Sequence, residues 1–137
     1  MDFNMLVELH KLIIGCDDSD LRPALTDDDI EVINASLIEM NKEYESIDEL
    51  MPDLFRFGGL TFLTQPFFDA NKRTIILMYR KITRDKGFDI DFENILKDNK
   101  FINLTPVFYD VDEMVSDSFL ERVGNIFVSN LKPKRNR

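Results

Sequence analysis

The chain has 137 residues, of which 44% are hydrophobic and 31% charged, and this is the size and composition of one ordinary folded domain. Its 17 basic and 26 acidic residues give a net charge of −9, which argues against general nucleic-acid binding and requires any phosphate site to be local. The single cysteine, Cys16, excludes an internal disulfide, and no stretch approaches the roughly 20 apolar residues that span a membrane. We therefore expect a cytoplasmic protein without nucleic-acid or membrane partners; the sequence indicates no oligomeric state.

Two helices are predicted in the N-terminal third of the chain. Apolar residues recur at helical spacing from Phe3 to Ile14, and Gly15 supplies a stop. After a loop, Thr26 precedes three aspartates and predicts the start of a second helix. The buried stripe of this second helix is expected at Ile30, Ile33, Leu37, Met40 and Tyr44.

The middle of the chain predicts a short connection and two further helices. Pro52 ends the connection, so Asp53 is expected to cap a helix that runs to about Leu63. Gly58 and Gly59 within this helix indicate close backbone packing. The next helix, 72–86, is apolar around most of its circumference and is expected to be the central one.

The last third is less regular. We expect an extended piece after Gly87, a short helix near Phe92 to Lys97, and a loop. Asp110 is expected to start the final helix, and the basic end "KPKRNR" has no apolar anchor and is expected to be a disordered tail over 132–137. Residues 1–131 then form a single all-α domain of about six helices.

One helix start breaks an electrostatic rule. A helix N-terminus carries a partial positive charge and favours acids, yet Lys72 and Arg73 directly follow Asn71 where the helix begins. With Asn71 as N-cap, the free backbone N–H groups and the two cations would form an anion-binding corner, which favours a bound phosphate. Asp69 on the preceding loop could hold a divalent cation such as Mg²⁺, with Phe67 as an apolar pin that fixes the loop.

At these residues the sequence resembles a known family. The stretch "QPFFDANKRT" is similar to the signature loop of the Fic/Doc family, which reads His-x-Phe-x-Asp/Glu-x-Asn-Gly/Lys-Arg. The positions that match are Phe67, Asp69, Asn71, Lys72 and Arg73. Asn-Lys-Arg, with Ile76 where the Fic branch has a further Arg, resembles the Doc (death-on-curing) branch. The resemblance is tight from Gln65 to Thr74 and loose from about Leu6 to Ile90.

The resemblance implies a fold, an activity and a ligand set. It implies the Fic fold, with the segment from Tyr44 to Met51 as a flap that aligns a target segment by strand addition. The activity would be transfer of a nucleotidyl group (AMPylation) or a phosphate (phosphorylation) from ATP or another NTP, with Mg²⁺, to a Ser, Thr or Tyr hydroxyl of a target protein. Catalytic positions would be Gln65, Asp69 and Arg73, Mg²⁺ would bind Asp69, and the nucleotide would contact Phe67, Asn71, Lys72, Arg73 and Thr74.

One position departs from the family pattern. The family's general base is a His, and this chain has Gln65, which cannot take up a proton at neutral pH. The only histidine, His10, lies in the apolar stripe of the first helix, where a structural role is expected. The chain as written is therefore expected to be inactive or impaired. A single base separates His and Gln codons, so both a natural and a substituted Gln65 remain open.

The resemblance also implies a restraining partner. Some family members carry an inhibitory Ser/Thr-x-x-x-Glu-Gly/Asn helix, but "SLIEMN" from Ser36 has Met40 at the Glu position. A separate antitoxin, as in a toxin-antitoxin pair, is then the expected restraint. Two alternatives stay open beside the transferase: a pseudoenzyme that only binds nucleotide or a partner, and a helical interaction module in which the motif is structural.

Overall fold

The computed structural model describes residues 1–15, 21–67, 70–97 and 117–132. They form an all-α domain of six helices: α1 (Phe3–Ile14), α2 (Asp27–Glu39), α3 (Ile47–Thr64), α4 (Asn71–Asp85), α5 (Phe92–Lys97) and α8 (Asp117–Ser129). Within these ranges extended pairing is limited to two isolated antiparallel bridges, Leu21 with Phe67 and Ile90 with Leu131. No helix in the described part of the chain is long and apolar enough to cross a membrane.

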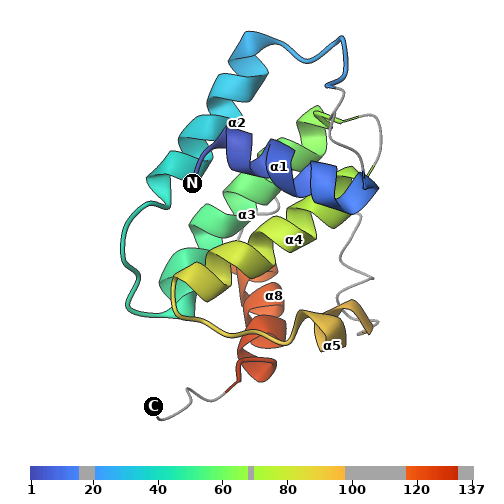
Figure 1. Cartoon of the computed structure of the whole chain (residues 1–137). Helices are drawn as coiled ribbons and strands as arrows, with labels where there is room; N and C mark the ends of the chain where they lie inside the picture. Colours follow the sequence, from blue (N-terminus) through green and yellow to red (C-terminus); the bar gives the residue numbers. More distant parts are fainter. Residues whose placement is uncertain (16–20, 68–69, 98–116, 133–137) are drawn as a thin grey trace.

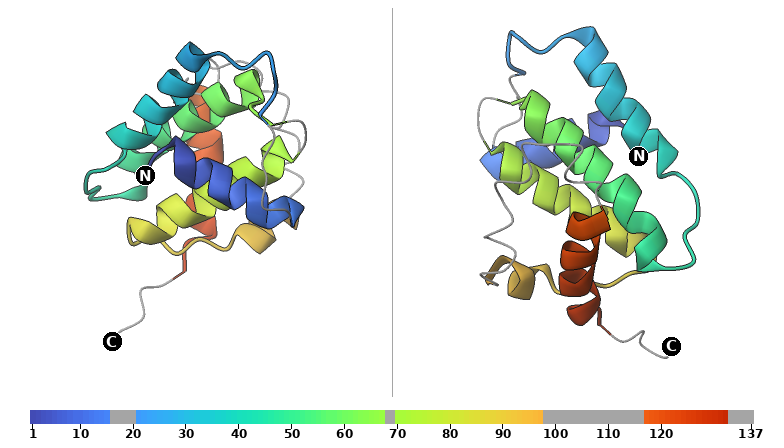
Figure 2. Two further views of the ribbon diagram at one scale, coloured as in Figure 1. Left: turned by 45° about the horizontal axis from the view of Figure 1, so that its top comes forward. Right: turned by 180° about the vertical axis from the view of Figure 1, so that it is seen from behind.

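The helices are arranged around an antiparallel pair. Figure 1 shows α3 and α4 side by side and running in opposite directions, with α1 in front of them. The view from behind in Figure 2 shows α8 on the opposite side. In agreement, α1 packs against α4 and α2, whereas α3 packs against α2, α4 and α8. The core therefore lies between these helices, and the ends of α4 stay near the surface.

The starts of the first two helices follow directly from local sequence signals. The Asp2 carboxylate accepts a hydrogen bond from the Met5 N–H, and Gly15 ends α1 in the left-handed region at φ 67°. Thr26 and Asp29 form a reciprocal capping box at α2. The predicted first helix and second helix start are confirmed, but α2 ends at Glu39, so Tyr44 lies in the following connection.

The third helix begins earlier than predicted. Ser46 caps it by accepting from the Glu49 N–H, and the Glu49 carboxylate accepts from the Glu45 N–H. Pro52 is accommodated inside the helix, because the carbonyl that loses its partner belongs to Asp48 at the exposed start, where water can bond it. Residues 47–51 are thus helical, and the predictions of an extended flap there and of an Asp53 cap are wrong.

That α4 is the central helix stays a prediction, and among the described residues both α3 and α4 are extensively buried. Ten residues of α3 are buried but only seven of α4, because α3 is packed by three helices. Ile75, Met78, Tyr79 and Ile82 of α4 face the core, whereas Ile76 and Leu77 are only half-buried.

The predicted short helix is confirmed as α5. The expected helix start at Asp110 and the end of the basic tail lie outside the described residues.

The predicted close packing at Gly58 is confirmed. A Cβ atom built there would overlap with the hydroxyl of Tyr79 and lie 2.6 Å from its ring carbon Cζ. Tyr79 is fully buried, with Phe55 and Phe57 at edge-to-face angles to its ring. The missing side chain of Gly58 therefore lets α4 pack closely against α3.

Candidate functional site

The connection between α3 and α4 has strained backbone at both ends. Gln65 (φ 47°) and Ala70 (φ 57°) are the two non-glycine residues with positive φ in the described part of the chain. Each such residue costs on the order of 1 kcal/mol, so surrounding contacts must hold it in place. Gln65 forms the C-cap of α3, with its N–H donating to the Thr61 carbonyl at 2.9 Å. Strain of this kind is found more often at functional loops than elsewhere.

Arg22 holds the first part of this loop from both sides of Gln65. Its guanidinium Nη2 donates to the Thr64 carbonyl at 2.7 Å, and its backbone N–H donates to the Pro66 carbonyl at 2.9 Å. Its Nε is buried and finds no hydrogen-bond partner among the described residues. The sequence pattern does not predict this role of Arg22; its one local signal is Pro23, which restricts the preceding residue to extended backbone.

Phe67 anchors the loop in the core, as predicted for an apolar pin. It is fully buried, and its ring stacks on the imidazole of His10 with centroids 3.8 Å apart and planes within 3°. His10 is itself 2% exposed, so the expected structural role of the only histidine is confirmed. Phe67 therefore supports the loop from inside.

Asn71 closes the loop, but not as the predicted N-cap. The N-cap of α4 is Ala70, and Asn71 is the first helical residue. Its side-chain Oδ1 accepts from the Phe67 N–H at 3.0 Å, and its Nδ2 donates to the Phe67 carbonyl at 2.9 Å. This reciprocal amide pair satisfies both backbone groups of Phe67 where the chain turns. An Asn at this position is needed for its combined donor and acceptor.

The amide pair leads to a stability prediction. Asn71→Asp keeps the acceptor but removes the donor, and it places a carboxylate against the Phe67 carbonyl. We expect a loss of about 1–2 kcal/mol in the free energy of unfolding, measured by urea denaturation. The control is Asn34→Asp, because among the described residues Asn34 makes one side-chain hydrogen bond, in which its Oδ1 accepts from the Phe3 N–H. Equal effects of the two substitutions would contradict the role given to the amide pair.

Among the described residues, no negative charge compensates the positive charge at the start of α4. α1, α2 and α3 each begin with a side-chain cap, but no side chain caps α4, and its first turn contains no acid. Lys72 and Arg73 lie there with exposed side chains that make no ion pair with a described residue. The positive end of the α4 dipole and the two cations therefore both favour a negatively charged ligand.

The other predicted site residues are placed differently. Thr74 is fully buried, and its hydroxyl donates to the Ala70 carbonyl at 2.7 Å, so it supports the strained loop end. Gln65 is half-buried at the start of the loop. Asp69 lies outside the described residues. Within the described ranges, no three His, Cys, Asp or Glu side chains form a group that could hold a metal ion by themselves.

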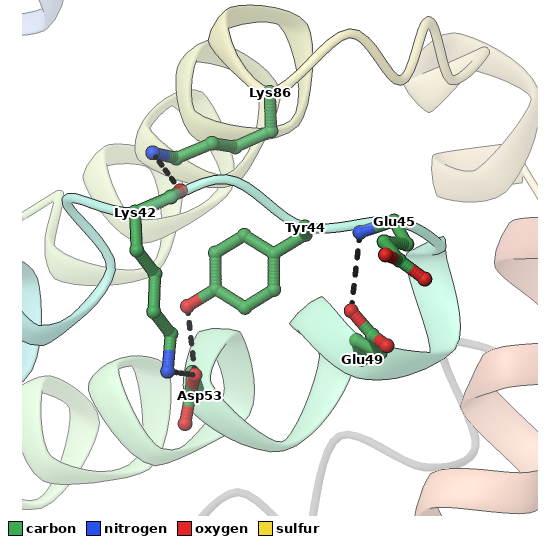
Figure 3. Close-up of polar contacts among 6 residues, drawn as sticks. All are labelled: Lys42, Tyr44, Glu45, Glu49, Asp53 and Lys86. Carbon is green, nitrogen blue, oxygen red and sulfur yellow. Dashed lines mark hydrogen bonds and ion pairs between the residues drawn. The ribbon is translucent and has the colours of Figure 1, made fainter.

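A polar cluster at the other end of α4 occupies the place of the predicted flap. The Tyr44 hydroxyl donates to the Asp53 carboxylate at 2.7 Å, and the Lys42 ammonium lies 3.6 Å from the same carboxylate. The Lys86 ammonium donates to the Lys42 carbonyl. Figure 3 shows how these residues lie together. Partial burial and the Asp53 carboxylate raise the pKa of the Tyr44 hydroxyl, which therefore stays protonated as a donor. These contacts tie the connection between α2 and α3 to α3 and α4. Residues 42–44 border a shallow cavity of about 630 Å³.

The geometry thus brings Gln65, Phe67, Asn71, Lys72, Arg73 and Thr74 into one loop and helix start. Phe67, Asn71 and Thr74 build the loop, while Lys72 and Arg73 are free to meet a ligand. Comparison with family models, with curated proteins and with solved structures finds no match to this chain.

Proposed function

We propose that this chain is a nucleotide-binding domain of the Fic/Doc type, which holds the phosphates of ATP or another NTP at the start of α4. The observation that carries the proposal is the first turn of α4, where Lys72 and Arg73 are exposed and no described side chain caps the backbone N–H groups. Because the strained loop is held by Arg22 and Asn71, the corner is preorganised for its ligand.

The transferase chemistry of such a site is mainly positioning and charge neutralisation. Arg73 would bind phosphate oxygens with its planar guanidinium, and Lys72 would add a second charge. Asp69 would hold Mg²⁺, which needs only one or two carboxylates when phosphates and water complete its shell. Bound in this way, Mg²⁺ neutralises phosphate charge. The acceptor would be a Ser, Thr or Tyr hydroxyl of a target protein.

Proton transfer is the missing component of this site. Gln65 stands where the family pattern has its base, and it cannot accept the proton of a target hydroxyl. His10 cannot replace it, because it is buried against Phe67. The chain as written therefore binds nucleotide without efficient transfer. This favours a nucleotide- or partner-binding pseudoenzyme as the second candidate function.

A protein partner is part of the proposal. The 137 residues contain no clean match to the family's inhibitory motif, which motivates external restraint, and we propose an antitoxin-like chain that binds near the Phe67 loop. Copurification from the native operon is the measurement, and a gene without an interacting neighbour would contradict this part.

The test of the phosphate site is nucleotide affinity. Arg73→Ala is expected to weaken ATP binding roughly tenfold to a hundredfold, because it removes a charge-assisted contact to phosphate. Isothermal titration calorimetry with Mg²⁺ and ATP measures the affinity. The control is Arg84→Ala, which removes an exposed arginine from the last turn of the same helix. No ATP binding by the parent, or equal losses in the two variants, would overturn the proposed site.

A further inference from the structure

A pocket on the surface of α4 lies next to the proposed phosphate site. It has a volume of about 330 Å³ and is bordered by the end of α1, by α4 and by the start of α5. In Figure 1 these three segments lie near one another, with α5 beneath the first half of α4. The pocket is mostly apolar, with contributions from Ile13, Ile76, Leu77 and Phe92. Ile76 and Leu77 are the α4 residues that the core leaves half-buried.

The charges around this pocket are mainly positive, although the chain as a whole is acidic. Lys72 and Arg73 border it at the start of α4, and Arg80 borders it further along the helix. Seven residues separate the two arginines, so their backbones are about 10 Å apart along the helix axis. Of the described residues that line the pocket, Glu93 is the one acid. An apolar floor with cations at one end fits a ligand that joins a flat apolar group to an anionic group.

We propose that this pocket binds the base of the nucleotide whose phosphates lie at the start of α4, an inference that rests on the proposed function. The phosphates would lie at Lys72 and Arg73, and the nucleoside would extend along α4 over Ile76 and Leu77. Arg80 is exposed and offers a planar guanidinium that can stack on a base, whereas Phe92 is 5% exposed and contributes to the apolar floor. Glu93 can accept hydrogen bonds from the ribose hydroxyls or from an amino group of the base.

The proposal predicts how the ligand is recognised. Stacking does not distinguish one base from another, because every base has a π-face. ATP and GTP are therefore expected to bind with similar affinity. Inorganic tripolyphosphate, which has no base, is expected to bind roughly tenfold more weakly than ATP.

The experiment compares ATP with tripolyphosphate by calorimetry in the presence of Mg²⁺. Leu77→Gln is expected to weaken ATP binding about tenfold and to leave tripolyphosphate binding unchanged, whereas Arg73→Ala weakens both. Ile38→Gln is the control, because Ile38 is a half-exposed residue of α2 that does not line the pocket. Leu77 is itself half-buried, so its substitution should leave the fold intact, which a thermal denaturation curve checks.

The outcomes separate the two proposals. If ATP and tripolyphosphate bind the parent equally, or if Leu77→Gln leaves ATP affinity unchanged, the base does not use this pocket and only the inference fails. If Leu77→Gln weakens both ligands equally, it acts on the phosphate corner, and the inference fails again. If neither ligand binds the parent, the proposed function fails and the inference with it.

Discussion

The Gln65→His variant is expected to transfer label from ATP to a target protein about 10²–10⁴-fold faster than the parent, which is the usual contribution of a positioned general base. The residues that we propose to bind phosphate, Lys72 and Arg73, are unchanged in this variant, so the substitution adds only the proton acceptor that the family pattern has at this position. The measurement is transfer of radiolabel to lysate proteins from ATP labelled at the α- or the γ-phosphate. The position of the transferred label distinguishes AMPylation from phosphorylation.

The backbone at position 65 suits this substitution. Gln65 has φ 47° and ψ 65°, in the left-handed region, where histidine is found several-fold more often than most residues. Two hydrogen bonds from Arg22 to the flanking carbonyls and one from the Gln65 N–H to Thr61 hold this conformation. None of the three involves the side chain of residue 65, so a histidine should adopt the same backbone.

The control for this experiment is Gln65→Asn. Asparagine also favours the left-handed region but cannot take up a proton, so it separates relief of backbone strain from proton transfer. We expect Gln65→Asn to remain as inactive as the parent. Full transfer activity of the parent would contradict the account of Gln65. If Gln65→His still binds ATP but transfers no label, the result would indicate a pseudoenzyme.

Gly58→Ala is expected to lower the free energy of unfolding by about 3 kcal/mol, at the upper end of the usual cost of overpacking a core. The added methyl group would overlap with the Tyr79 hydroxyl, and Tyr79 is fully buried between aromatic rings, with a cavity of only about 10 Å³ beside it. Either the tyrosine must leave its rotamer or α3 and α4 must move apart. Urea denaturation measures the change.

Two further variants test the cause. Gly124 lies in α8, and a Cβ there would meet nothing within 4 Å, so Gly124→Ala should instead stabilise the protein by up to about 1 kcal/mol through helix propensity. Adding Tyr79→Phe to Gly58→Ala removes the hydroxyl and should recover part of the loss. Destabilisation by Gly124→Ala equal to that of Gly58→Ala would contradict the steric explanation.

Local signals in the sequence were sufficient for several features of the fold. Thr26 with Asp29 starts α2, and Gly15 ends α1, because caps depend on residues within one helical turn. The close packing at Gly58 was predicted from its cost to a helix. The sequence also revealed the unusual cations Lys72 and Arg73, because the preference of a helix N-terminus for acidic residues depends only on residues of the first turn.

Tertiary contacts decided the rest. Pro52 indicates a helix boundary when taken alone, but α3 continues through it because the core buries residues on both sides and Ser46 caps the earlier start. Asn71 reads as a cap, yet its amide pairs with Phe67, a residue whose position depends on His10 in α1. Likewise, only the packing of all helices shows which apolar residues of α4 remain at the surface. The sequence by itself therefore determined the all-α class, the caps of α1 and α2 and the cations at the start of α4, because those depend on neighbours along the chain. The shape of the loop and the pocket on α4 depend on residues brought together from α1, α4, α5 and the segment at Arg22, and only the tertiary structure places those side by side.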